Sequence, residues 1–172
     1  MKRIIILIIL LPLLLSCIGI GRQQVKVVEM STAYNQSGIN KSYHIDSKKR
    51  KVISYIAPVE SFENLLQTTP IGKIDKISRD NPGYEFIFYC DRLSGPGDTL
   101  KMKELLKRYG CRFTVYMDFN DEFYNANKPL FTGLAQRWNK ISYICDEKNR
   151  ILDVATIGTK MSVFDQVFRK YR

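Results

Sequence analysis

The chain has 172 residues, with 27 lysines and arginines against 17 aspartates and glutamates and a formal net charge of +10. Hydrophobic residues make up 45% of the sequence, enough to build the core of one ordinary domain. The single histidine, His44, excludes a histidine-rich metal cage, and the four cysteines, at positions 17, 90, 111 and 145, show no Cys-x-x-Cys spacing.

The first segment has the composition of an export signal. Met1, Lys2 and Arg3 are followed by an apolar run of twelve residues from Ile4 to Leu15. As a helix, twelve residues span about 18 Å, well short of the roughly 30 Å hydrocarbon core of a bilayer. We therefore predict that residues 1–16 are a signal peptide and not a membrane span.

The next motif is a candidate lipid attachment site. Leu14-Leu15-Ser16-Cys17 resembles the lipobox of bacterial lipoproteins. The resemblance implies cleavage before Cys17, transfer of a diacylglycerol to its thiol and acylation of the new amine, an anchor far firmer than one acyl chain. Ile18 stands where an aspartate would retain the protein in the inner membrane, so we expect the outer membrane, facing the periplasm. The alternative is an ordinary signal with an incidental cysteine.

Residues 17–45 are expected to be the lipidated N-terminus and a tether, because glycines and a polar run dominate them, although Val25–Val28 could form a short strand. The predicted domain covers residues 46–172 and opens with the basic cluster Lys48–Lys51. The cluster has no interleaved aromatic residues for base stacking, so nucleic acid is not an expected partner. We interpret it as a solvated lead-in to a strand, with contact to anionic headgroups as the alternative.

Strand and helix patterns alternate beyond this cluster. Predicted strands are short runs of β-branched and aromatic residues, and predicted helices are amphipathic stretches that begin or end near Pro or Gly. The expected strands are residues 52–57, 84–90, 113–117, 141–145 and 151–155. The expected helices are residues 60–66, 72–78, 100–109, 121–127 and a final helix that contains Val163 and Tyr171. The polar link 146–150 predicts an antiparallel hairpin.

This order predicts an α/β fold with a mixed central sheet of about five strands and helices on both faces. Residues 105–123 and 144–151 resemble bacterial thioredoxin-like lipoproteins related to the periplasmic TlpA-type thiol-disulfide oxidoreductases. The resemblance covers roughly residues 48–172. It implies a thioredoxin-like fold for this part of the chain.

The chain lacks the sequence motif on which the chemistry of these relatives depends. They carry Cys-x-x-Cys after the first core strand, at a helix N-terminus that stabilises the thiolate. The corresponding place here reads Ser61-Phe62-Glu63-Asn64. An alternative alignment starts the fold at Tyr84 and puts Ser94-Gly95-Pro96-Gly97 there. Neither contains a dithiol, and Trp138-Asn139-Lys140 lacks the proline that thioredoxins carry before the hairpin.

Cys90 is the candidate for any remaining thiol chemistry. It ends a predicted central strand, at the edge where α/β sheets place their sites, and Arg92 is nearby. The alternative is a buried structural cysteine. Cys111 and Cys145 are expected to be structural and not joined in a disulfide.

Two further groups receive structural interpretations. Asp118, Asp121 and Glu122 could hold Ca²⁺, but they lack the alternating ligands of a calcium loop, so we expect Asp121 and Glu122 to favour a helix start. A relay between His44 and Ser61 has no supporting signal.

The sequence thus predicts a cell-envelope lipoprotein whose redox-inactive thioredoxin-like domain has a protein-interaction or scaffolding role. The alternative is a divergent thiol oxidoreductase or peroxidase that acts through Cys90. The lack of a dithiol, a triad and a metal cluster in the sequence argues against an enzyme, and no metal or cofactor is expected. The expected partners are the membrane, through Cys17, and an envelope protein. The oligomeric state stays open.

Overall fold

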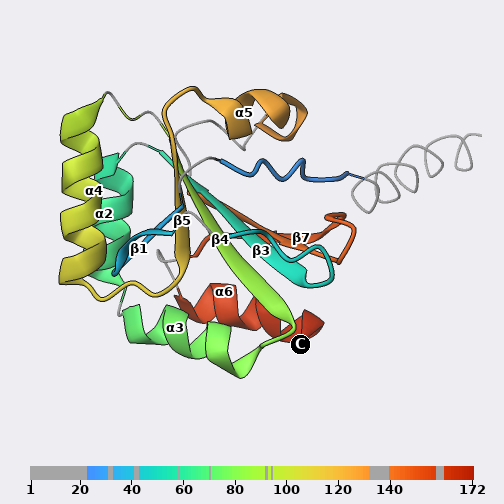
Figure 1. Ribbon diagram of the computed structural model, residues 1–172. Coiled ribbons are helices and arrows are strands. Elements are labelled where there is room, and N and C mark those ends of the chain that lie inside the picture. The colour runs from blue at the N-terminus through green and yellow to red at the C-terminus, as the bar shows by residue number, and fades with distance from the viewer. Residues whose placement is uncertain are drawn as a thin grey trace, which may run out of the picture.

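A seven-stranded mixed sheet lies at the centre of the folded structure (Figure 1). The computed structural model describes residues 23–30, 33–40, 43–57, 59–69, 71–91, 93, 95–131, 140–157 and 161–172. The strands are β1 (Ala33–Asn35), β2 (Gly38–Asn40), β3 (Arg50–Ile56), β4 (Tyr84–Asp91), β5 (Thr114–Asp118), β6 (Ile141–Cys145) and β7 (Ile151–Ala155). The helices are α2 (Val59–Thr68), α3 (Ile71–Asp80), α4 (Pro96–Arg108), α5 (Glu122–Ala126) and α6 (Met161–Phe168), with the 3-10 helices η1 (Lys128–Phe131) and η2 (Arg169–Tyr171).

The three central strands are parallel and buried on both faces. The strand order is β2-β1-β5-β4-β3-β6-β7, with β3 parallel to β4 and β4 parallel to β5. Every residue of β3 from Lys51 to Ile56 is buried, as a strand covered on both sides requires. The expected hairpin is confirmed: β6 and β7 are antiparallel, and β6 continues the sheet from β3.

Two strands more than the expected five come from the segment before β3. β1 pairs antiparallel with β5, where Ala33 lies opposite Tyr116, and β2 pairs with β1. Each of these strands has three residues, too few to show an alternating pattern in the sequence. The prediction of about five strands was therefore too low.

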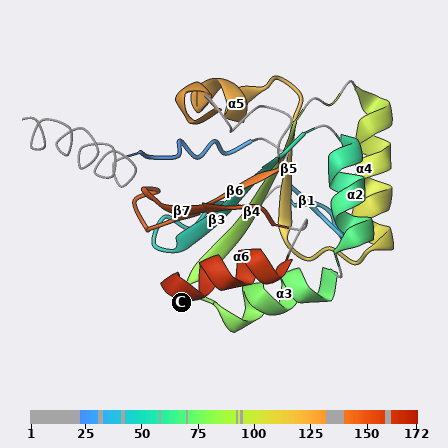
Figure 2. The same cartoon turned by 180° about the vertical axis from the view of Figure 1, so that it is seen from behind.

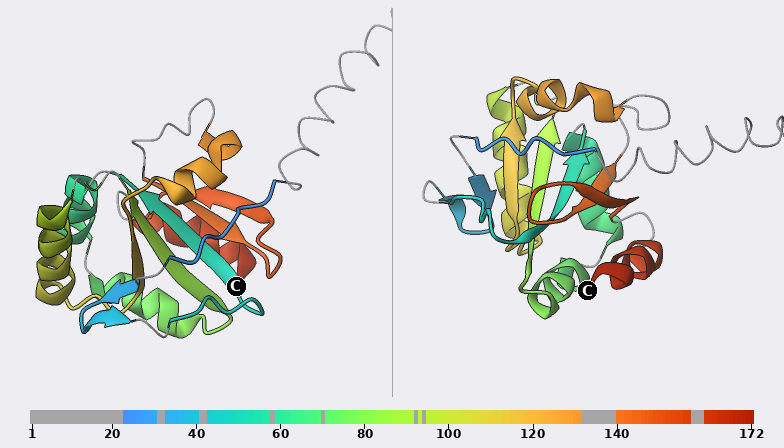
Figure 3. Two further views of the ribbon diagram at one scale, coloured as in Figure 1. Left: turned by 45° about the horizontal axis from the view of Figure 1, so that its top comes forward. Right: turned by 90° about the vertical axis from the view of Figure 1, so that its right-hand side faces the viewer.

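An extended segment, residues 23–30, which we call the strap, lies across the sheet on the side of α5 (Figures 1 and 3). Val25 is 1% exposed, and its N–H donates to the carbonyl of Asn149 at 2.9 Å. The N–H of Ile151 donates to the carbonyl of Gln23 at the same distance. The expectation of a tether through residue 45 is thus wrong from residue 23 onward, because these residues pack on the domain.

The helices are divided unequally between the two faces. The helices α2, α3, α4 and α6 contribute to one core, while α5, η1 and the strap cover the other face (Figures 1 and 2). The chain steps from β3 to β4 to β5 in one direction across the sheet, and right-handed crossovers then place the connecting helices on the same face. The prediction of helices on both faces is confirmed, and among the described residues the second face is covered by the short helices α5 and η1 together with the strap.

Each face has its own aromatic core. Phe62, Phe88 and Phe168 belong to the core under the four longer helices. Under the strap, Tyr89 stacks on Phe123 with ring centroids 4.0 Å apart. Among the described helices, none combines the length and the apolar character that crossing a bilayer requires. The predicted signal peptide and Cys17 lie outside the described residues.

Candidate functional site

The carboxyl ends of β3, β4 and β5 form the edge at which an α/β sheet places its sites. At the end of β3, helix α2 begins at Val59, so Ser61-Phe62-Glu63-Asn64 lies within its first two turns. These four side chains do not converge. Phe62 is fully buried and meets Phe88 edge to face at 6.4 Å, whereas Asn64 is exposed and accepts a hydrogen bond from the Lys140 ammonium at 3.0 Å.

The exposed face of α2 is tied to α4 by an ionic contact. The Lys101 ammonium lies 2.7 Å from a carboxylate oxygen of Glu63 and 4.0 Å from one of Glu60. The hydrogen bond that the Lys101 ammonium donates to the Glu63 carboxylate raises the pKa of Lys101. Glu60 also lies in the first turn of α2, where the N-terminal end of the helix dipole stabilises a carboxylate.

The alternative alignment, with its fold starting at Tyr84, is wrong. It would leave β3 outside the fold, yet β3 lies between β4 and β6 in the sheet. In the segment 94–97, Ser94 lies outside the described residues, Gly95 precedes α4 with φ 145°, and Pro96 is the first helical residue. A φ in this range suits glycine, and proline suits the first turn.

Cys90 lies where the sequence predicts, near the end of β4, but it is fully buried. Its neighbours across the sheet are Ile56 in β3 and Met117 in β5. Burial, and to a smaller extent the carboxylate of Asp91, raises the pKa of the Cys90 thiol far above its ordinary value. Since the thiolate is the nucleophile, this environment suppresses reactivity. Arg92, the expected partner, lies outside the described residues.

The other two cysteines of the domain are also buried, and all three are free thiols. Cys111 belongs to the core under the longer helices and Cys145 to the core under the strap. Burial raises the pKa of each to about 12. Their burial agrees with the expectation that Cys111 and Cys145 are structural residues.

Two buried carboxylates lie side by side at the ends of β4 and β5. Asp91 is paired in register with Asp118, and the Tyr55 hydroxyl donates a hydrogen bond to Asp91. Asp118 accepts the backbone N–H groups of Glu122 and Phe123, both at 2.8 Å, and so caps α5. Burial raises the pKa of Asp118, while these two hydrogen bonds act in the opposite direction.

The expected acidic helix start is present, since Glu122 lies in the first turn of α5, but the sequence interpretation missed the roles of Asp91 and Asp118. Asp121 stands at the N-cap position in a left-handed conformation without a side-chain capping bond. The available signal was an acidic residue directly after each apolar strand. In the part of the chain that the structure describes, no three His, Cys, Asp or Glu side chains are grouped to hold a metal.

Two hollows open at the same edge, and Phe119, the residue after β5, lines both. The first, about 470 Å³, is mainly apolar and is lined by Gly95, Pro96, Thr99, Leu100, Lys103 and Phe119. The second, about 290 Å³, has Glu29, Asp118 and Glu122 in its wall. Leu100 is 61% exposed and Phe119 43% exposed. We call these two side chains and the apolar hollow the Phe119 edge, a candidate docking surface.

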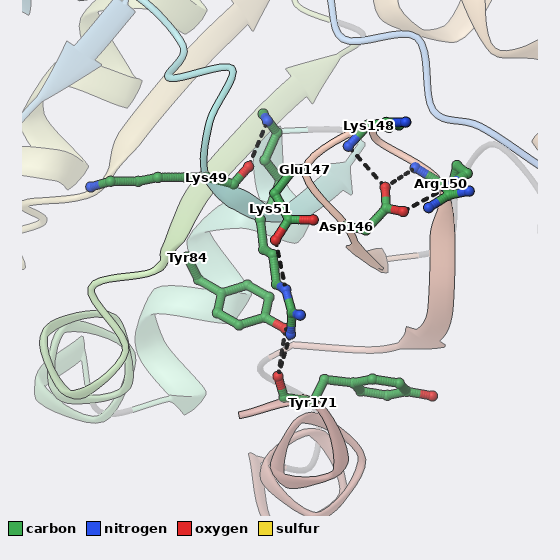
Figure 4. Close-up of polar contacts among 9 residues, drawn as sticks. Lys49, Lys51, Tyr84, Asp146, Glu147, Lys148, Arg150 and Tyr171 are labelled. Carbon is green, nitrogen blue, oxygen red and sulfur yellow. Dashed lines mark hydrogen bonds and ion pairs between the residues drawn. The ribbon is translucent and has the colours of Figure 1, made fainter.

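The basic cluster Lys48–Lys51 lies at the opposite end of β3, and its side chains have separate roles (Figure 4). Lys51 is 2% exposed, and its ammonium donates to the carbonyl of Lys49 at 2.8 Å. The Arg50 guanidinium lies 3.0 Å from both Glu147 and the carbonyl of Tyr171. The interpretation of this cluster as a solvated lead-in to a strand was therefore wrong for Lys51, whereas the Arg50 side chain, at the first residue of β3, is 42% exposed.

Neither a protein-family model nor a curated sequence matches the chain. Solved structures match its fold. A thioredoxin-like protein in the oxidized form has a TM-score of 0.58 at 12% identity, over 87% of this chain and 94% of that one. A thiol-disulfide oxidoreductase from Bacteroides fragilis has a TM-score of 0.56 at 7% identity, over 87% and 100%. A putative thiol:disulfide interchange protein DsbE from Chlorobium tepidum has a TM-score of 0.54 at 10% identity, over 86% and 94%. The chain has the thioredoxin-like fold.

Proposed function

We propose that this chain is a lipoprotein of the cell envelope whose thioredoxin-like domain is redox-inactive and binds a protein partner. The observation that carries the proposal is the burial of the three domain thiols and their raised pKa values. Cys90, Cys111 and Cys145 are all buried with raised pKa values, while the first turn of α2 carries Glu60 and Ser61. A scaffold with such thiols has no group poised for disulfide exchange.

The Phe119 edge supports the binding role. Leu100 and Phe119 expose apolar area beside an apolar hollow, at the edge where related folds place their sites. Lys103 lies at the same hollow. The matching partner is a protein segment that inserts an apolar side chain and carries an acidic residue next to it.

The first test is thiol labelling of the full chain, followed by mass spectrometry with and without denaturant. A thiol with a pKa of about 12 is ionised in about one part in 10⁴ at pH 8, against roughly a quarter for an ordinary cysteine. Burial slows labelling further. We expect all three domain cysteines to label only after unfolding. Rapid labelling of one of them in the folded protein would overturn the redox-inactive part of the proposal.

The second test is photo-crosslinking in cells from position 119, where Phe119 is replaced by a photoreactive phenylalanine. We expect a discrete protein adduct that is lost when Leu100→Glu is added. Val163, an apolar residue of α6 that is 48% exposed, provides the matched control as Val163→Glu, which should leave the adduct unchanged. An adduct insensitive to Leu100→Glu would contradict binding at the Phe119 edge.

Anchoring is tested separately. Lipidation of Cys17 predicts that the mature chain starts at Cys17 and that its N-terminal peptide carries the mass of the added acyl groups. Cys17→Ser should release the protein from the outer membrane fraction. A processed chain without acyl groups would contradict this part of the proposal and leave the binding test intact.

The alternative function is a divergent thiol oxidoreductase or peroxidase that acts through Cys90. Two of the solved structures that share its fold are a thiol-disulfide oxidoreductase and a putative thiol:disulfide interchange protein, which favours this alternative, and the position of Cys90 near the carboxyl end of β4 agrees with it. The burial of Cys90 and its raised pKa argue against it. Peroxide consumption or disulfide reduction that Cys90→Ala abolishes, with unchanged unfolding, would establish it.

A further inference from the structure

The strap fixes the position of Gln23, six residues after Cys17, on the domain. Gln23 and Gln24 are joined to the β6–β7 turn: the carbonyl of Gln23 accepts the N–H of Ile151, and the Gln24 side-chain amide donates to the carbonyl of Lys148 at 2.5 Å. Between Cys17 and Gln23 there are six peptide steps, which span at most about 20 Å even when fully extended. An acylated Cys17 would therefore keep this turn close to the lipid headgroups.

Two turns with basic side chains lie together on this side of the domain. The turn before β3 carries Lys48 and Lys49, and the β6–β7 turn carries Lys148 and Arg150. Figure 4 shows Lys49, Lys148 and Arg150. The two turns are linked, because the guanidinium of Arg50, the first residue of β3, binds Glu147. Figures 1 and 3 place the end of the strap, this hairpin turn, the start of β3 and the C-terminus towards the same end of the sheet, although the strap and the C-terminal helix cover opposite faces. We call these two turns the anchor-side surface.

The acidic groups of this surface are engaged within it. Asp146 is 7% exposed and accepts the backbone N–H of Lys148 and of Arg150, as well as the Arg150 guanidinium at 2.6 Å. Glu147 is paired with Arg50, and Asp46 accepts the N–H of Lys48 at 2.9 Å. By contrast, no ion pair among the described residues involves the ammonium groups of Lys48, Lys49 or Lys148.

We infer that the anchored domain lies with the anchor-side surface against the membrane, where Lys48, Lys49 and Lys148 bind the phosphate groups of anionic lipids. This inference rests on the proposed lipidation of Cys17. The short reach allows the turns to touch the headgroups, and within the Debye length of about 8 Å at physiological ionic strength the three ammonium groups are then attracted by the surface charge. Each basic side chain at an anionic membrane strengthens binding roughly fivefold.

The orientation also leaves the proposed docking surface free. The Phe119 edge lies at the carboxyl ends of the parallel strands, and the anchor-side surface lies at their amino ends. A domain held at its amino-end turns by lipid would present Leu100 and Phe119 away from the bilayer. The anchor and the three lysines would then act together as a positioning device for the partner-binding edge.

The test is lysine footprinting of the full, acylated protein in vesicles. Amine labelling is compared, residue by residue, in phosphatidylcholine vesicles with and without phosphatidylglycerol. We expect labelling of Lys48, Lys49 and Lys148 to fall about fivefold when the anionic lipid is present and to recover in 1 M salt, where the Debye length is about 3 Å. Lys107, an exposed residue of α4, should label equally in both.

A pair of charge-reversal variants provides the control, with Lys49 as the reporter. Lys48→Glu with Lys148→Glu should abolish the protection of Lys49. Lys107→Glu with Arg108→Glu makes the same change in net charge on α4 and should leave the protection intact. Soluble inorganic phosphate at the same concentration should not protect Lys49, which separates a headgroup surface from a site for free phosphate.

Several results would overturn the inference. Equal labelling of the three lysines in neutral and anionic vesicles would show that the domain does not use them at the membrane. Equal protection of Lys107 would show a different orientation. An N-terminal peptide without acyl groups would remove the premise and count against the proposed anchoring as well, whereas an acylated chain with unprotected lysines would refute this inference alone.

Discussion

Asn127 joins the strap to the domain, and its replacement gives the sharpest test of whether residues 23–30 belong to the fold. Asn127 is 2% exposed and follows α5. Its side-chain oxygen accepts the N–H of Lys26 at 2.8 Å, and its amide group donates to the carbonyls of Lys26 and Phe123, each at 2.9 Å. One side chain thus makes three hydrogen bonds, two of them to the strap.

We expect Asn127→Ala to lower the free energy of unfolding by about 2–3 kcal/mol. Each hydrogen bond contributes about 0.5–1.5 kcal/mol, so three bonds would contribute about 1.5–4.5 kcal/mol. The value is taken from the lower half of this range because Lys26 is exposed, and water can replace part of what its backbone loses. The assay is urea unfolding of the full chain, with hydrogen exchange to follow the backbone N–H groups of Lys26 and Val28.

Asn125→Ala serves as the control. Asn125 is exposed, and its side chain makes one long hydrogen bond, 3.5 Å to the carbonyl of Asn120. Its replacement should change the unfolding free energy by less than about 0.5 kcal/mol. If Asn127→Ala behaves like this control, and the Lys26 amide exchanges at an unchanged rate, the reasoning that the strap is an integral part of the domain fails.

The remaining predictions test other contacts of the fold. Tyr89→Phe should lower the free energy of unfolding by about 1–2 kcal/mol, because the Tyr89 hydroxyl accepts the N–H of Val28 and donates to its carbonyl. Tyr116→Phe should be neutral or stabilising, since the buried Tyr116 hydroxyl has no hydrogen-bond partner in the described structure. Equal losses of stability in thermal unfolding of the two variants would contradict this. Phe62→Ala should cost about 3–5 kcal/mol in urea unfolding, since Phe62 is fully buried; a small effect would mean that it is not a core residue. Burial opposes the charged form of Asp146, but its hydrogen bonds outweigh burial and lower its pKa. The stability that the Asp146 carboxylate contributes is therefore present above the unfolded pKa of about 3.9 and is lost as the pH falls through the folded pKa. Asp146→Asn should thus cost about 1–2 kcal/mol at pH 7, with a difference that shrinks towards pH 2; a constant difference would refute the linkage.

Prediction from sequence succeeded where local composition decides the structure. The run Tyr84–Cys90 is apolar at nearly every position and could form only a strand covered on both faces. The polar link 146–150 between two apolar runs led to the β6–β7 hairpin for a similar local reason. At the candidate site, the burial of Cys90 was left open, because an apolar strand end is compatible with a reactive or a structural thiol.

Prediction failed where the stabilising partner lies far along the chain. The strap is held by Asn127 and Tyr89, which are 101 and 61 residues from the backbone groups that they bind. No local pattern in residues 23–30 predicts these hydrogen bonds. The three-residue strands β1 and β2 likewise depend on β5, a strand much later in the sequence. In the same way, Asp118 became the cap of α5 only because the chain turns back after β5.

The sequence by itself determined the order of the central strands and helices, since each needs only its own apolar pattern, and the lack of a dithiol, since that is a matter of composition. The tertiary structure alone decided which thiols are buried, that residues 23–30 cover the second face of the sheet, and that Lys148 lies beside the turn of Lys48 and Lys49. These properties arise from contacts between residues distant in the chain, and burial and charge are set by such contacts rather than by neighbours in sequence.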